Sequence, residues 1–347
     1  MYRYIGNKSK LLDYIIGKTK DIIGKSGTVA DIMAGTGMVS LEYRKNGYNV
    51  IASDMMTYSK CHLITNLLNS KSPEFKNLTS LKIAGMSMYE SILAYLNNLE
   101  GTEGYFYNEF SPEGIPDNGY SPRKYFTSKN AKKIDAIRQE LENWIQNKKI
   151  NSNEEAVLKH TLIMAVNKVA NISGTYGYFL SKFTKNSIED IFLEPQEFCN
   201  IGSTNNKVMQ GFAEDVAKNI KADLCYIDPP YTKRQYAANY HILETIARGD
   251  NPIAQGKSGL RDWWDQHSKF CTKTRIRDSF KKVIKDMDCP CFLISYSEDG
   301  LLSINELVDF LEQFGKTTVS TIDYKRFRSN QSELPNKIQE YIIELYK

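Results

Sequence analysis

Asp228, Pro229, Pro230 and Tyr231 follow one another at the end of an apolar run, and together they are suited to holding a planar amine. The prolines fix φ and lack backbone donors, so the run 222–227 cannot continue as a central strand. The Asp228 carboxylate and the Pro229 carbonyl can each accept an N–H, and Tyr231 offers an aromatic face. Base-flipping enzymes hold an extruded nucleobase with such groups. The alternative is an ordinary turn, in which Asp and Pro serve turn geometry alone.

A glycine-rich turn at residues 34–37 lies between an apolar run and a helix-like pattern, which predicts a ligand site at a helix N-terminus. A second predicted strand ends at Asp54, about twenty residues past the glycines, where a carboxylate meets ribose hydroxyls. Ser40 replaces the third glycine of the dinucleotide fingerprint, which disfavours NAD or FAD. A nucleoside cofactor without phosphates, such as S-adenosylmethionine, fits better. The alternative is a structural turn with Asp54 as a helix cap.

In their order along the chain, these motifs resemble the α group of DNA adenine-N6 methyltransferases, the Dam-like enzymes. The resemblance is strongest to modification enzymes of type IIS restriction systems such as FokI. The segment 3–10 resembles the family's first cofactor motif, with Tyr4 where Dam-like enzymes often have Trp and Lys8 at the family lysine. The segment 210–215 resembles the part that meets the cofactor's adenine ring, and further similar segments extend the resemblance over nearly the whole chain.

The resemblance implies an S-adenosylmethionine site and a target-base site. Lys8 is expected toward the cofactor's carboxylate and Asp54 on its ribose hydroxyls. Two departures stand out: Met33 occupies a position where many relatives have Phe, and the acid usual near Phe212 is displaced toward residues 214–215. The expected catalytic residues are Asp228, Pro229, Pro230 and Tyr231, and the expected cofactor residues are Tyr4, Lys8, Asp31, Ala34, Gly35, Thr36, Gly37, Asp54, Phe212 and Asp228.

Duplex DNA is the partner that the resemblance implies, and basic residues are expected to hold its phosphates. Basic residues gather in two clusters, at 269–285 and 325–328. Such clusters are also found on solvated surfaces that bind nothing, and this alternative stays open. The expected DNA contacts are Lys124, Lys129, Asn130, Lys233, Arg234, Tyr236, Asn239, Tyr240, Lys281 and Arg326.

Composition indicates a soluble globular protein. The chain has 347 residues, 41% hydrophobic and 25% charged, with a formal net charge of +4. It contains no apolar run near the ~18 residues that span a bilayer, and its N-terminus lacks a secretory signal pattern, so a cytoplasmic protein is expected. The six cysteines lack paired spacing and are expected to be reduced thiols, and the four histidines predict no metal site.

The expected fold is a Rossmann-like methyltransferase sheet with a helical insertion lobe. Residues 1–70 and 204–347 are expected to form the catalytic domain, and residues 71–203 the insertion. Within the insertion, helices are expected at 86–99, 132–145 and 154–169, and a loop rich in Gly, Pro and aromatics at 105–125. The insertion is expected to recognise the DNA target, and the alternative is a cover that only stabilises the core.

Other functions remain open at this point. A cytosine-N4 methyltransferase would share the fold but more often has Ser at the place of Asp228. RNA or protein-amide methyltransferases have similar tetrads but usually lack a segment like 3–10. A nucleic-acid-binding subunit without catalysis is the alternative of another class. A cognate restriction endonuclease and a monomeric state are expectations, and the target sequence is not readable from the chain.

Overall fold

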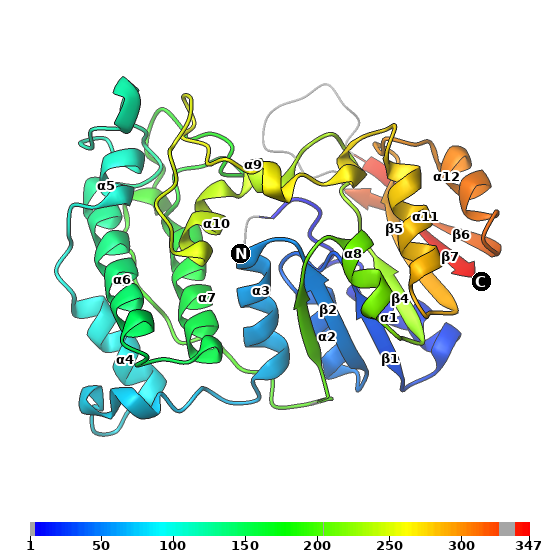
Figure 1. Ribbon diagram of the computed structural model, residues 1–347, viewed down its shortest axis with the longest axis horizontal. Helices are drawn as coiled ribbons and strands as arrows, with labels where there is room; N and C mark the ends of the chain where they lie inside the picture. Colours follow the sequence, from blue (N-terminus) through cyan, green and yellow to red (C-terminus); the bar gives the residue numbers. More distant parts are fainter. Residues whose placement is uncertain (1–3, 204, 326–336) are drawn as a thin grey trace. The chain divides into compact units, whose positions relative to one another are not determined.

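The computed structural model describes residues 4–203, 205–325 and 337–347. In this described part, seven strands form one mixed sheet in the order β3-β2-β1-β4-β5-β7-β6 (Figure 1). The strands are β1 (Thr28–Asp31), β2 (Asn49–Asp54), β3 (Lys207–Gln210), β4 (Leu224–Ile227), β5 (Cys291–Ser297), β6 (Lys316–Lys325) and β7 (Lys337–Tyr346).

The first five strands are parallel, and the hairpin of β6 and β7 enters the sheet with β7 antiparallel to β5. Ala30 pairs with Cys225, and Cys225 pairs with Phe292, which places β4 in the middle of the sheet. Every residue of β4 is buried, as expected for a parallel strand covered on both faces.

Helices cover both faces of this sheet. On one face Ile15 and Ile16 of α1 and Tyr43 of α2 pack with Val50 and Tyr226. On the other face α8, α11 and α12 pack against the opposite side chains of β4 and β5. The fold class expected from the sequence is therefore confirmed. The helices are α1 (Leu12–Ile23), α2 (Met38–Lys45), α3 (Thr57–Leu63), α8 (Ala213–Val216), α11 (Ile276–Asp286) and α12 (Ile304–Leu311).

A second group of elements is helical, and the three helices expected in the insertion are confirmed. Two of these helices have capping boxes, Ser87 with Glu90 and Asn151 with Glu154, which satisfy their first backbone donors. The helices are α4 (Met88–Asn98), α5 (Tyr105–Phe110), α6 (Ser128–Gln146), α7 (Ser152–Val169), α9 (Tyr236–Asn239) and α10 (His241–Arg248).

Helix α5 corrects the expected loop at 105–125. The buried carboxylate of Asp135, on α6, accepts hydrogen bonds from the backbone N–H groups of Gly104, Phe106 and Tyr107 at 3.1, 2.9 and 2.8 Å. These are the donors that a short helix leaves without partners. A residue some thirty positions along the chain supplies the cap, so local sequence patterns did not reveal the helix.

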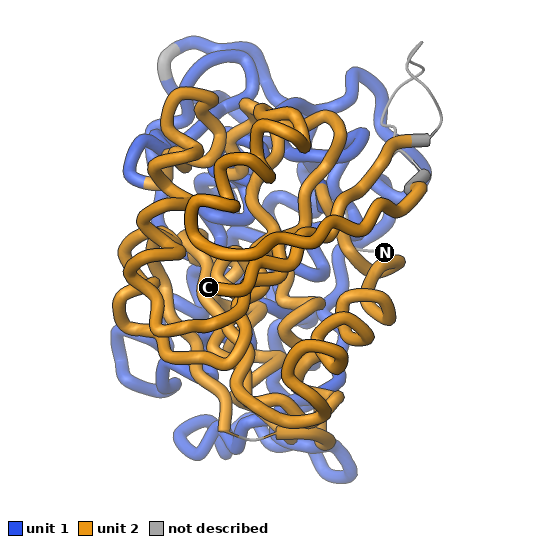
Figure 2. Tube along the Cα trace, turned by 90° about the vertical axis from the view of Figure 1, so that its right-hand side faces the viewer, with its two compact units in different colours: residues 1–5, 71–198, 237–265 blue, residues 6–70, 199–236, 266–347 orange. Residues whose placement is uncertain are grey.

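The chain divides into two compact units (Figure 2). Unit 1 contains residues 1–5, 71–198 and 237–265, and unit 2 contains residues 6–70, 199–236 and 266–347 with the whole sheet. Residues 237–265 thus belong to unit 1, although the sequence placed them with the catalytic domain. The reason is that α10 packs against α7. No described helix is long and apolar enough to cross a membrane.

Candidate active site

The tetrad 228–231 follows β4 directly, at the carboxyl edge of the parallel strands. The Tyr231 hydroxyl donates to Asp228 Oδ1 at 2.5 Å and lies 3.3 Å from Ser295 Oγ on β5. The ring packs edge-on against Tyr296, with centroids 5.5 Å apart. The Leu301 N–H donates to the Tyr231 carbonyl at 2.8 Å. Asp228 and Tyr231 are therefore fixed by the two central strands of the sheet.

Lys8 lies in this same site. Its side chain is only 5% exposed, its ammonium donates to the Tyr231 hydroxyl, and it lies 3.4 Å from Asp228 Oδ1 and 3.5 Å from Glu340 Oε2. The sequence placed this lysine at the cofactor's carboxylate. In the structure its ammonium instead contacts the two side chains expected to hold the target base.

The electrostatics of Asp228 follow from this environment. Burial raises the pKa of the Asp228 carboxyl, while the Lys8 charge and the Tyr231 hydrogen bond oppose that rise. Burial also raises the pKa of Glu340, and Lys8 again opposes it. Lys8 therefore favours the ionised form of both carboxylates, and an ionised Asp228 is the form that accepts hydrogen bonds on both oxygens.

The glycine-rich turn follows β1, the strand next to β4. Gly35 and Gly37 have φ of 53° and 75°, which an L side chain rarely adopts. At Gly37 a Cβ would also lie 3.0 Å from Leu63 Cδ2. The Asp54 carboxylate accepts from the Gly35 N–H at 2.9 Å and from the Met56 N–H at 2.8 Å. Ala34 and Thr36 are the remaining, half-buried members of the turn.

Asp31 lies at the end of β1 beneath the turn, and it is 1% exposed. Ser40 Oγ donates to its Oδ2 at 2.6 Å, whereas its Oδ1 has no hydrogen-bond partner among the described residues. Burial raises the pKa of Asp31 to about 7, and the charges of Asp228 and Asp54 add to the rise. An unsatisfied buried acceptor below this turn fits a bound polar ligand such as S-adenosylmethionine.

Phe212 is the half-buried residue that precedes α8, and the Gly211 N–H donates to the Asp54 carbonyl at 3.0 Å. This bond brings the segment expected to meet an adenine ring beside Asp54. Of the two acids nearby, Glu214 is buried and accepts from Ser279 Oγ at 2.6 Å, and Asp215 pairs with Lys282 at 2.9 Å. Both displaced acids are thus engaged with α11.

Among the DNA contacts expected in unit 2, Lys233 and Arg234 are exposed just after the tetrad. Tyr236 is half-buried, with its hydroxyl near Gly6. Lys281 is exposed on α11, which leads into the start of β5 and so runs away from the edge where Asp228 lies. Arg326 lies outside the described residues.

Asn130 corrects the expected DNA contacts in unit 1. It is 1% exposed, its Nδ2 donates to the Glu189 carbonyl at 2.8 Å, and its Oδ1 accepts from the Ile191 N–H at 2.9 Å. An amide that is buried and bonded at both ends is occupied by its own fold. The Asn130 side chain therefore supports the fold of unit 1, and we do not propose it as a DNA contact.

The remaining expected residues of unit 1 differ in exposure. Lys124 is exposed, and exposed Lys129 pairs with Asp190 at 2.6 Å. Tyr240 is fully buried, its hydroxyl accepts from the Ile5 N–H at 2.7 Å, and its ring stacks on Tyr4 at 4.7 Å. The Asn239 Oδ1 accepts from Thr175 Oγ1 at 3.2 Å. Tyr4 and Tyr240, expected to touch cofactor and DNA respectively, thus stack on each other.

Sequence reasoning missed Glu340 and Ser295. Both lie in strands with several other polar residues, and nothing in the local sequence distinguishes them from these neighbours. A signal existed only in the pairing of β5 and β7, which sets Glu340 opposite Ser297.

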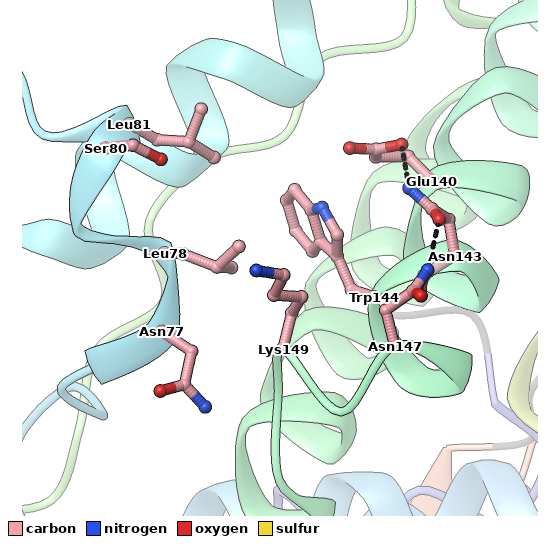
Figure 3. Close-up of a pocket in the computed structure, with 9 residues that line it drawn as sticks. All are labelled: Asn77, Leu78, Ser80, Leu81, Glu140, Asn143, Trp144, Asn147 and Lys149. Atoms are coloured by element: carbon pink, nitrogen blue, oxygen red, sulfur yellow. Dashed lines mark hydrogen bonds between the residues drawn. The ribbon is translucent and has the colours of Figure 1, made fainter.

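Unit 1 also contains a cavity of about 230 Å³ (Figure 3). Trp144 and Leu78 supply apolar walls, and three polar side chains bond to one another: Asn143 Nδ2 donates to Glu140 Oε2 at 3.2 Å, and Asn147 Nδ2 donates to Asn143 Oδ1 at 2.7 Å. These internal bonds leave it no distinctive chemistry, and we assign it no role. Its lining residues are Asn77, Leu78, Ser80, Leu81, Glu140, Asn143, Trp144, Asn147 and Lys149.

Comparison with known proteins gives a consistent picture. Type II methyltransferase M.NlaIII of Neisseria lactamica is 35% identical over 96% of this chain and 94% of its own length. M.CviAII of Paramecium bursaria Chlorella virus 1 is 32% identical over 99% of this chain and 98% of its own length. M.FokI of Planomicrobium okeanokoites is 33% identical over 99% of this chain, which spans 52% of that protein. A model of the D12 class N6 adenine-specific DNA methyltransferases matches residues 4–310, and the chain belongs to this family.

Proposed function

We propose that Asp228, Pro229 and Tyr231 hold the target adenine and that the turn after β1, with Asp31 and Asp54, holds S-adenosylmethionine beside it. The chain is a site-specific adenine-N6 DNA methyltransferase, and enzymes of its family use S-adenosylmethionine. The observation that supports our assignment is the pairing of β1 with β4, in which Asp31 lies opposite Tyr226. Because the strands are parallel, the turn and the tetrad leave the same edge side by side.

The chemistry explains why these groups are needed. The lone pair on N6 of adenine is delocalised into the ring, so the amine is a weak nucleophile. S-adenosylmethionine supplies an electrophilic methyl group on a sulfonium. The Asp228 carboxylate and the Pro229 carbonyl accept hydrogen bonds from the two N–H groups of N6 and so localise its lone pair. Tyr231 orients the adenine ring. Asp228 need not be a strong base, because the methylated amine is positive and loses its proton readily.

The cofactor assignment uses two carboxylates near the glycine-rich turn. The Asp54 carboxylate accepts the backbone N–H groups of Gly35 and Met56, and at the end of β2 we assign it to the ribose hydroxyls of the cofactor. Asp31 Oδ1, buried and without a partner among the described residues, is placed to accept from the amino group of the methionine part. Gly35 and Gly37 let the backbone approach the ligand, and Phe212 lies where an adenine ring would pack.

We further propose that residues 71–203 recognise the DNA target, with Lys124 as an exposed contact. We keep Tyr4 as a proposed cofactor contact. The other proposed DNA contacts are Lys129, Lys233, Arg234, Tyr236, Asn239, Tyr240 and Lys281. The curated relatives StsI and LlaI are named modification methylases, and we propose the same role here, with a cognate endonuclease. Identities of 33% to M.FokI and 35% to M.NlaIII support the family equally, so the type IIS placement is a proposal too.

The test is methyl transfer to unmethylated genomic DNA, with the product nucleosides separated and identified. We expect N6-methyladenine, and sequencing of the methylated bases should show one short recognition sequence. N4-methylcytosine as the product would contradict the assignment of the base site. Methylation of RNA in preference to duplex DNA would contradict the proposed substrate.

A further inference from the structure

Glu340 is a buried carboxylate on β7 that the proposed chemistry does not use. Its side chain is 8% exposed, and its Oε2 has no hydrogen-bond partner in the described part of the chain. The Lys8 ammonium lies 3.5 Å from this oxygen. Burying a carboxylate oxygen without a hydrogen bond costs free energy. The positive charge of the lysine at this distance offsets part of that cost.

Lys8 is therefore shared between two carboxylates at nearly equal distance, 3.4 Å to Asp228 and 3.5 Å to Glu340. In the described part of the chain, Asp228 and Tyr231 from the end of β4 and Glu340 from β7 are titratable side chains around this lysine. Asp31 on β1 and Tyr226 on β4 interact with Asp228 through charge. Ser295 and Ser297 of β5 are the neutral polar groups.

This arrangement creates a conflict, because Lys8 contacts the same two groups that the target amine must use. The amine can bond to Asp228 only if the ammonium gives up part of its contact there. A buried ammonium that loses its anion is strongly disfavoured. We propose that Glu340 is a positioning residue that draws the Lys8 ammonium off the Asp228–Tyr231 pair when the target amine binds. The inference rests on the function proposed above for Asp228.

The chain offers a matched control. Glu344 is on the same face of β7, since side chains alternate along a strand, and it pairs with Lys18 of α1 at 2.8 Å. Its side chain is 10% exposed, so it is comparable in burial to Glu340. Glu344→Gln removes a similar ion pair from the same strand without touching Lys8 or Asp228.

The experiment measures steady-state methylation of unmethylated duplex DNA from pH 5 to 9 for the full chain. Glu340→Gln should lower kcat/KM for DNA by about 10- to 100-fold, because Lys8 stays on Asp228. The acidic limb of the pH–rate profile should move to lower pH. The reason is that the pKa of Asp228 falls when Asp228 keeps its contact with the Lys8 ammonium and the negative charge of Glu340 is removed. Cofactor affinity, measured by calorimetry, should stay within about twofold of wild type, and Glu344→Gln should be near wild type throughout.

A double-mutant cycle tests whether Glu340 acts through Lys8. In a Lys8→Met background, Glu340→Gln should cause no further loss, because no ammonium remains to be drawn away. Glu340→Asp, which keeps the charge, should show an intermediate rate with a wild-type acid limb. This variant also decides the matter if thermal unfolding shows that the Gln variant does not fold.

Three results would overturn the inference: a loss in Glu340→Gln with an unmoved acid limb, an equal loss in the Lys8→Met background, or the Asp variant behaving like Gln. In each case wild type still makes N6-methyladenine. If wild type makes none in any DNA, the proposed function fails instead, so the two failures are distinguishable.

Discussion

Polar side chains at the carboxyl edge of the sheet in unit 2 and on helix α6 of unit 1 differ in how they are hydrogen-bonded. At the sheet edge, Asp31 has a buried oxygen with no hydrogen-bond partner among the described residues. The Lys8 ammonium forms an ion pair with Asp228 Oδ1 at 3.4 Å. In unit 1, Asn130 is bonded at both ends by backbone, and the Asp135 carboxylate caps α5. An unsatisfied acceptor at the end of a strand favours ligand binding, whereas these polar side chains of α6 hold neighbouring segments of the fold.

Asp228→Ala is expected to have the largest effect on methyl transfer. It removes the acceptor for the target amine, so methyl transfer should fall by at least about 10²-fold. Cofactor affinity should largely survive. Transfer is measured with labelled cofactor and affinity by calorimetric titration. A variant that methylates at near the wild-type rate would show that the chemistry lies elsewhere.

Asp31 is expected to make the free energy of unfolding depend on pH. Its pKa is raised from 3.8 to about 7 in the folded protein, so the protonated form stabilises the fold below pH ~4. That stability is lost as pH rises from about 4 through 7. Because one pKa unit equals about 1.4 kcal/mol, the full change is a few kcal/mol.

Asp31→Asn should remove this pH dependence, since an amide does not ionise and its oxygen can still accept from Ser40. Denaturant unfolding of both proteins at pH 5 and pH 8 measures it. An unchanged difference between the two pH values in the variant would mean that Asp31 is not the titrating group.

Asp54→Ala should weaken S-adenosylmethionine binding by ~1.5–3 kcal/mol, because it removes hydrogen bonds to a charged acceptor. The Gly35 N–H also loses its partner, so the turn itself is loosened. Calorimetric titration gives the affinity, and Asp54→Asn is the conservative comparison. Unchanged affinity in the Ala variant would refute the placement of the cofactor at this turn.

Asn130→Ala tests the opposite side of the comparison. It leaves the backbone of Glu189 and Ile191 without partners, so the free energy of unfolding should fall by about 1–3 kcal/mol. The methylated sequence should not change. Lys124→Ala, at an exposed position, should instead leave stability intact and relax or shift the site. Methylation maps that change with Asn130 and not with Lys124 would reverse this assignment.

The smallest effect is expected at Lys281. Its position on α11, which runs away from the catalytic edge, predicts at most a weak phosphate contact. Lys281→Ala should lower DNA affinity by less than about tenfold, reduce the salt dependence by about one charge or less, and leave the methylated sequence unchanged. A large loss of affinity would mean that DNA also contacts this face of unit 2.

Local patterns in the sequence were enough to predict the α/β class, the turn at 34–37, the break at the tetrad and the helices of the insertion. It could do so because glycine turns, proline breaks, caps and helical periodicity act within a few residues. The family resemblance added the cofactor and the target base.

Only the tertiary structure decided which polar groups remain available. Lys8 reaches Asp228 and Glu340 across more than two hundred residues of sequence, and Asn130 is occupied by backbone some sixty residues away. The same is true of Asp135, whose carboxylate makes α5 a helix in a segment that reads as a loop. Hydrogen bonding and charge pairing depend on distance in space, and no local pattern records which distant chain segment will supply the partner.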